Sequence, residues 1–174
     1  LLKQHPGCVR CDEAAFRLGY CLNQESRSAA AAKVLSNLVQ QYPKSRFAAD
    51  AYLLMGEVWF EANKFIAAMG NYQMVFRRYP KSGMAGYAEY KYAWSIYHQA
   101  KYAAAIASLH RVVRHRKAQL KKQALTDLVT FYAEVPGGWV RAHRYYMKVG
   151  GLKLALRNMW RMARFLDAQD KNEP

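Results

Sequence analysis

YLLMGEVWFEANKFIAAMGNYQMVFRRYP, residues 52–80, matches EYKYAWSIYHQAKYAAAIASLHRVVRHRK, residues 89–117, at a shift of 37 positions. Small residues meet small ones, as Gly56 meets Ala93, and large apolar residues meet each other. The other matched pairs are Trp59 with Ile96, Phe65 with Tyr102, Ala68 with Ala105, Tyr72 with Leu109, and Val75 with Val112. A fixed period of this length indicates stacked repeats, each of which buries its apolar face against its neighbours.

Prolines at the same interval mark the ends of helices. Pro6, Pro43 and Pro80 lie 37 residues apart. Because a proline cannot continue a helix and disfavours helical geometry in the residue before it, each one ends the second helix of a pair. The expected helices span residues 12–24, 28–42, 47–62, 65–79, 84–100, 102–116, 119–133 and 152–168.

These helix pairs divide one solenoid domain, residues 1–174, into units. The expected units are 12–43, 44–80, 81–117 and 118–151, with a partial unit before residue 12 and a last or capping helix at 152–168. In the fourth unit, Pro136-Gly137-Gly138 predicts the turn between the two helices. Gly150-Gly151 predicts the end of the second helix, because glycine accepts the left-handed geometry found there.

The composition favours a folded protein over a disordered one. Apolar residues make up 52% of the 174 residues, which is sufficient for a hydrophobic core. The sequence contains no run of about 18 or more uncharged apolar residues, so it predicts no transmembrane helix. No charged, apolar and small-residue sequence typical of a secretory signal opens the chain.

The pattern within each unit resembles the tetratricopeptide repeat. The positions that carry the resemblance in one unit are Tyr52, Met55, Gly56, Trp59, Ala68, Tyr72, Val75 and Pro80, and those in the preceding unit run from Ala15 to Pro43. The family's usual period is about 34 residues, so the extra residues here lengthen the turn between units. The resemblance implies an all-α fold, a right-handed α-solenoid of antiparallel helix pairs. It also implies a non-enzymatic scaffold that binds other proteins.

The turns between units resemble those of one branch of this family. Tyr42-Pro43-Lys44-Ser45 and Tyr79-Pro80-Lys81-Ser82 are similar to turns in bacterial cell-envelope members. That branch includes BamD-like outer-membrane lipoproteins, YbgF-like periplasmic proteins and repeat proteins of gliding motility. The resemblance implies a periplasmic or outer-membrane location, and the expected partners are other protein subunits of a larger assembly.

Family geometry places part of each first helix on the concave side of the solenoid, where partners bind. The candidate partner-binding residues there are Glu57, Phe60, Tyr87, Tyr90, Trp94 and Tyr97. The last four recur every three or four residues and so share one helix face, and aromatic rings with polar groups suit a binding surface. The alternative is that part of this stripe packs against the next unit. The Lys/Asn clamp that some family members use for a peptide carboxylate is absent from these positions.

Positive charge is concentrated near the C-terminus. Residues 101–174 carry +10 of the net charge of +15, with 15 Lys and Arg against 5 Asp and Glu. The candidate basic residues are Arg111, Arg114, Arg116, Lys117, Lys121 and Lys122 at one turn, and Lys153, Arg157, Arg161 and Arg164 on the last helix. The last four are expected opposite an apolar face of Leu152, Ala155, Met159, Met162 and Leu166. Such a surface attracts acidic proteins or anionic lipid. The alternative function is a cytoplasmic module that binds nucleic acid or another polyanion, although no nucleic-acid-binding motif occurs.

No residues stand in a catalytic, cofactor-binding or metal-binding pattern. His98, His110 and His115 are expected on solvated helix faces. Cys8 and Cys11 form a lone CxxC without the second ligand pair that a zinc site needs. The cysteines are either three free thiols or, in an oxidising compartment, joined as Cys8–Cys11 or Cys11–Cys21.

Overall fold

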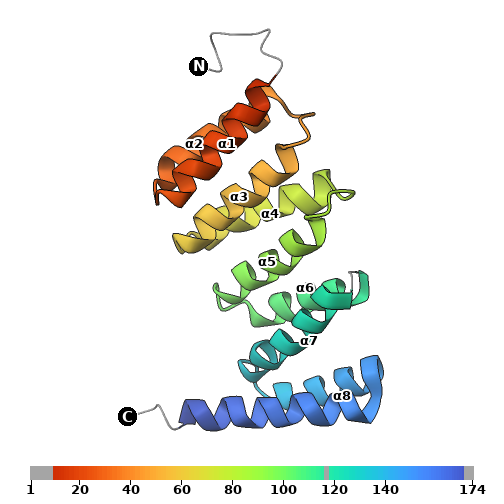
Figure 1. Cartoon of the computed structure of the whole chain (residues 1–174). Coiled ribbons are helices and arrows are strands. Elements are labelled where there is room, and N and C mark those ends of the chain that lie inside the picture. The colour runs from red at the N-terminus through yellow and green to blue at the C-terminus, as the bar shows by residue number, and fades with distance from the viewer. Residues whose placement is uncertain (1–9, 116–117, 171–174) are drawn as a thin grey trace. The chain divides into compact units, whose positions relative to one another are not determined.

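The computed structural model describes residues 10–115 and 118–170 and consists of helices joined by short turns (Figure 1). The helices are α1 (Cys11–Gln24), α2 (Ser28–Gln41), α3 (Ala48–Glu61), α4 (Phe65–Arg78), α5 (Ala85–Tyr97), α6 (Tyr102–His115), α7 (Ala118–Ala133) and α8 (Gly138–Asp170). These two described ranges contain no β-strand. The predicted all-α solenoid fold is therefore confirmed, and each helix begins and ends within a few residues of its expected bounds.

The longest helix, α8, changes direction where the sequence predicts a stop. Gly150 (φ −152°, ψ 15°) and Gly151 (φ 68°, ψ −167°) leave helical geometry, and they divide α8 into two segments. The positive φ of Gly151 is one that a residue with a side chain adopts only at a cost. The two glycines therefore end the second helix of the fourth unit, as predicted, and the segment after them is the expected last helix.

The chain forms two compact parts, Leu1–Ser95 and Ile96–Pro174, which divide within α5. The stacking of residues 1–174 as one continuous solenoid stays a prediction. None of the described helices is long and apolar enough to cross a lipid bilayer.

The turns inside the helix pairs repeat at the residue level. Ser26 (φ 58°), Asn63 (φ 58°), Ala100 (φ 57°) and Gly137 (φ 63°) all adopt the left-handed conformation, and they lie 37 residues apart. In the first three turns, the N–H of the next residue donates to a carbonyl five residues before it, as Lys64 N donates to Trp59 O at 2.8 Å. This hydrogen bond closes the end of the first helix in the manner of a Schellman motif. The period of the sequence is thus also a period of backbone geometry.

The turns between units repeat in the same way in the first part. The Ser45 hydroxyl accepts a hydrogen bond from the Phe47 N–H at 3.0 Å, and the Ser82 hydroxyl accepts one from the Met84 N–H at 3.1 Å. The hydroxyl of Tyr79, which precedes Pro80, donates to the Pro43 carbonyl at 3.0 Å and so ties one turn to the next. The Tyr-Pro-x-Ser sequence is therefore a structural unit: the serine hydroxyl accepts from the N–H of the residue before the next helix, and the serine carbonyl accepts from the N–H of the first helical residue, at 3.1 Å in both turns.

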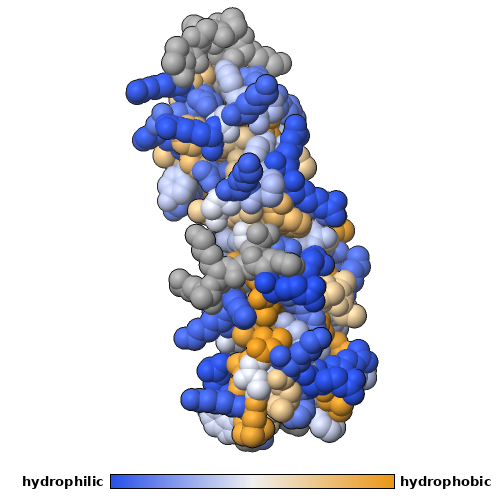
Figure 2. Space-filling model, turned by 90° about the vertical axis from the view of Figure 1, so that its right-hand side faces the viewer, coloured by the Kyte–Doolittle hydropathy of each residue, from blue (hydrophilic) through white to orange (hydrophobic). Residues whose placement is uncertain are grey.

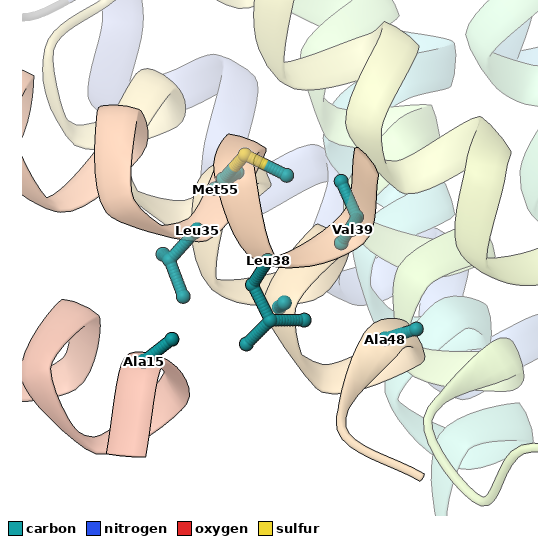
Figure 3. Packing of buried hydrophobic residues seen from close by; sticks show 7 residues of the cluster. Ala15, Leu35, Leu38, Val39, Ala48 and Met55 are labelled. Atoms are coloured by element: carbon teal, nitrogen blue, oxygen red, sulfur yellow. The ribbon is translucent and has the colours of Figure 1, made fainter. Parts of the chain in front are cut away.

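The core of the first part packs large apolar residues against small ones. Leu35, Leu38 and Val39 of α2 pack between Ala15 of α1 and Met55 of α3 (Figure 3). The glycines are needed for close approach. A Cβ atom added at Gly19 would lie 2.6 Å from the Leu35 side chain, and one at Gly56 would lie 2.5 Å from the Tyr72 ring.

The core of the second part continues the pattern. In this part α6 packs on α7, and α7 packs on α8. The repeat positions Ala105, Leu109 and Ala142 are fully buried, as is Tyr146, whose hydroxyl donates to the Leu125 carbonyl at 3.1 Å. The fourth unit therefore buries the same repeat positions as the units before it.

The three cysteines are not all free thiols. Cys11 is disulfide-bonded, whereas Cys21 is a free and exposed thiol. The pairing of Cys11 with Cys21 is therefore excluded. Cys8 lies outside the described residues.

Candidate binding surfaces

A cluster of one acid, one lysine and several aromatic rings joins α3, α4 and α5 in the first part. The Glu57 carboxylate accepts a hydrogen bond from the Tyr72 hydroxyl at 2.7 Å and pairs with the Lys91 ammonium at 3.2 Å. The same ammonium lies 3.9 Å from the centroid of the Phe60 ring, a cation–π contact. We call Glu57, Phe60, Tyr72, Tyr87 and Lys91 the aromatic–acid cluster.

Burial and charge fix the protonation state of the phenols in this cluster. Burial, and then the neighbouring Glu57 carboxylate, raise the pKa of Tyr72 far above its usual range. The same two causes, in the same order, raise the pKa of Tyr87. Both phenols therefore stay neutral and keep their hydroxyl protons as donors over the physiological pH range.

Three of the predicted stripe residues lie in the first part, and they differ in accessibility. Tyr87 is 40% exposed, and its ring lies 6.3 Å from that of Tyr90. Tyr90 and Trp94 are half-buried. The accessible portion of the stripe is therefore centred on Tyr87, next to the charged pair of the cluster.

The fourth stripe residue, Tyr97, packs inside the second part. Its ring stacks on Phe131 of α7 with 4.5 Å between centroids, and its hydroxyl donates to the Glu134 carboxylate at 2.8 Å. Burial and this hydrogen bond raise its pKa. Tyr97 thus follows the alternative for this stripe, since it packs against the first helix of the next unit.

The basic residues at the α6–α7 turn reach solvent where the structure describes them. The side chains of Arg114, Lys121 and Lys122 are exposed, as is that of Arg111, which also donates to the Ser108 hydroxyl at 3.1 Å. Arg116 and Lys117 lie outside the described residues. On α8, Lys153, Arg157 and Arg164 are exposed. Arg161 is instead half-buried, and its guanidinium donates to Thr126 of α7 at 3.3 Å and to Asn158 at 3.2 Å.

The apolar face predicted for the last helix is buried at its centre and exposed at its two ends. Ala155 and Met162 are buried as expected, but Leu152 is 59% exposed and Leu166 is 37% exposed. Asn158, which lies between the two buried residues, turns inward at 1% exposure. The buried face of this helix is therefore formed by Ala155, Asn158 and Met162, and it is not the same as the set of apolar residues.

The expectation that His110 is solvated is also wrong. Its ring stacks on Tyr145 with 3.9 Å between centroids, and its Nε2 lies 3.0 Å from the Tyr132 hydroxyl. Burial, and then the charge of Arg114, lower the pKa of His110 to about 4. His98 is exposed as expected. The described residues contain no group of three or more His, Cys, Asp or Glu side chains placed to hold a metal ion.

The sequence matches the tetratricopeptide repeat over residues 13–45, 50–82 and 87–117. The chain belongs to the tetratricopeptide repeat family. The three matched segments begin 37 residues apart, so the family match and the repeat period agree. They cover more than half of the chain and include most of α3, all of α4 and most of α5, the three helices that carry the aromatic–acid cluster.

Solved structures of MamA have a similar fold. A crystal structure of MamA is 16% identical, with a TM-score of 0.57 over 98% of this chain and 86% of that one. A MamA RS-1 double mutant is 12% identical, with a TM-score of 0.57 and coverage of 98% and 84%. MamA from Desulfovibrio magneticus RS-1, residue 41 to the end, is 14% identical, with a TM-score of 0.55 and coverage of 93% and 79%. At these identities the similarity concerns the fold. No curated protein matches the chain by sequence.

Proposed function

We propose that this protein is a non-enzymatic scaffold that binds another protein through the surface around Tyr87. Tetratricopeptide repeat proteins generally bind other proteins, which supports the class of function. The observation that carries the proposal is the aromatic–acid cluster. It places an accessible tyrosine beside a fixed Glu57–Lys91 pair on three packed helices.

The cluster suits the recognition of a protein segment for physical reasons. Tyr72 and Lys91 hold the Glu57 carboxylate in place, so a partner would meet charges whose positions are already set. This reduces the ordering cost of binding. Tyr87 offers an apolar ring and a polar hydroxyl, as rings at the centres of protein interfaces commonly do. A helix or extended segment with regularly spaced apolar residues fits such a surface.

The exposed basic residues Arg111, Arg114, Lys121 and Lys122 supply a second element of the proposal. An acidic partner surface would be drawn to them before docking. Charges of this kind raise the association rate more than the final affinity. Reversal of charge at Lys121 and Lys122 is therefore expected to slow association at low salt, while loss of the Tyr87 ring should speed dissociation.

We place the scaffold in a bacterial cell-envelope assembly, periplasmic or associated with the outer membrane. The Tyr-Pro-x-Ser turns, which the fold uses as a repeated structural unit, support this location by their resemblance to envelope members of the family. The disulfide at Cys11 also supports it, because disulfides persist in oxidising compartments and are rare in the cytosol.

A pull-down from envelope extract tests the proposed surface. Tyr87→Ala should reduce recovery of the bound protein about tenfold or more, which is a usual loss for an aromatic residue at an interface centre. Ile66→Ala is the control, because Ile66 of α4 is 76% exposed and lies outside the cluster. Equal recovery with both variants would reject the surface. A gel shift with unrelated nucleic acids that collapses steeply with salt, without recovery of a protein, would favour the polyanion-binding alternative.

A further inference from the structure

The outer face of α8 after its bend, over residues 152–169, serves neither the core nor the aromatic–acid cluster. Ala155, Asn158 and Met162 turn this segment inward, with at most 1% of each residue exposed. On the other side, Leu152 is 59% exposed, Leu156 is 60% exposed and Trp160 is 61% exposed. Residues four apart lie one above another on a helix. These three therefore form a single apolar row, which we call the outer ridge.

A row of positive charge runs beside the outer ridge. Lys153 and Arg157 each follow a ridge residue directly, and Arg164 lies four residues after Trp160. All three are exposed, and the Arg164 guanidinium lies 4.8 Å from the centroid of the Trp160 ring. Over α8, the sequence contains two acidic residues, Asp167 and Asp170, both near its C-terminal end. Figure 2 shows hydrophobic side chains among strongly hydrophilic ones at the level where Figure 1 places α8.

We propose that this outer face of α8 binds the surface of an anionic lipid bilayer. A helix lies in a membrane surface when leucine and tryptophan enter the boundary between headgroups and acyl chains while lysine and arginine meet the headgroups. The ridge and the basic row provide both parts on one exposed face. The long basic side chains reach the phosphates while their methylene stems stay among apolar groups. The tryptophan suits the headgroup level, where its ring is partly apolar and partly polar.

Charge separates the bilayer from a second copy of the chain as the occupant. A symmetric pair of ridges would bring Lys153, Arg157 and Arg164 of both copies together, while the acidic residues of α8 lie only near its C-terminal end. An anionic bilayer neutralises the basic row and admits the ridge at the same time. This inference does not depend on the Tyr87 surface, which lies on helices of the first part.

Co-sedimentation with lipid vesicles tests the proposal. The protein should sediment with vesicles of phosphatidylcholine and phosphatidylglycerol and much less with phosphatidylcholine alone. Leu156→Glu should lower the partition coefficient at least about tenfold, because the apolar insertion is lost and a negative charge is added. Arg157→Glu should lower it by a similar factor, since each basic residue near an anionic surface contributes about fivefold. Ile66→Glu and Arg78→Glu, exposed substitutions on α4, should bind as the wild type does.

Fluorescence adds a readout specific to the ridge. The emission of Trp160 should shift to shorter wavelength on addition of anionic vesicles, and Trp160→Phe should remove that shift. Leu156→Gln is the second apolar variant, should Leu156→Glu lose helicity by circular dichroism. Absence of binding to anionic vesicles would overturn the proposal, as would binding that depends on salt but is unchanged in Leu156→Gln. Self-association that Leu156→Gln abolishes, without vesicle binding, would assign the face to a second copy instead.

Discussion

Replacing an alanine by glycine usually destabilises a protein, but at the turn residue Ala100 we expect the opposite. Ala100 has a φ of 57°, and its repeat equivalents are Ser26, Asn63 and Gly137. The left-handed conformation costs a residue with a Cβ atom roughly 1–2 kcal/mol. Glycine removes that cost but adds about 0.4–1 kcal/mol of conformational entropy to the unfolded chain. Ala100→Gly should therefore stabilise the protein by about 1 kcal/mol.

Equivalent positions supply the controls for this prediction. Asn63→Gly should change stability little, because asparagine tolerates the left-handed region. Gly137→Ala should destabilise by about 1 kcal/mol through the backbone alone, since no atom lies within 4 Å of the added Cβ. Urea denaturation followed by circular dichroism would measure all three variants. If Ala100→Gly destabilises the protein, the claim that the period of the sequence is a period of backbone geometry fails at this turn.

Three further predictions concern packing, pH and association. Ala68→Leu and Ala105→Leu replace fully buried small residues and should each destabilise by about 1–3 kcal/mol through overpacking; a melt like that of the parent would contradict the helix contacts. The pKa of His110 is about 4 in the folded protein, against about 6.5 when unfolded. The unfolded state therefore binds more protons between these values, and stability should fall as pH drops from about 6.5 to 4, by at most about 1.4 kcal/mol per pH unit. Urea melts of the wild type and His110→Gln over that range should show a shallower slope in the variant. In stopped-flow binding to the captured partner, Lys121→Glu with Lys122→Glu should lower the association rate at low salt; an unchanged rate would make these lysines a solvated face only.

The repeat made most of the fold predictable from the sequence. The match of Gly56 with Ala93 identified close helix contacts, and the prolines identified the helix ends. Gly150 and Gly151 made the bend in α8 predictable, because paired glycines at that point of the repeat indicate the end of a helix. The left-handed conformation was not predicted in any of the turns inside the helix pairs, and the residue types at Ser26 and Ala100 do not signal it. Only their spacing from Asn63 and Gly137 could have revealed them.

The candidate surfaces were less predictable because they depend on which side of a helix faces its neighbours. Tyr87 and Tyr97 have the same spacing pattern, yet one is accessible and the other stacks on Phe131. On α8, Asn158 turns inward with Ala155 and Met162 although its Nδ2 has no hydrogen-bond partner among the described residues, and Leu152 is exposed. His110 is half-buried against the Tyr145 ring on α8, which lies 35 positions away in the sequence. The outer ridge could have been found from the four-residue spacing of Leu152, Leu156 and Trp160.

Site-specific photocrosslinking at position 87 tests the central claim most directly. A photoreactive phenylalanine analogue in place of Tyr87 retains a large ring at the proposed contact, and the same analogue in place of Ile66 is the control on α4. The scaffold account predicts one discrete protein adduct from position 87 in intact cells and none of that mass from position 66. The same adduct pattern from both positions, or no protein adduct from position 87, would contradict it.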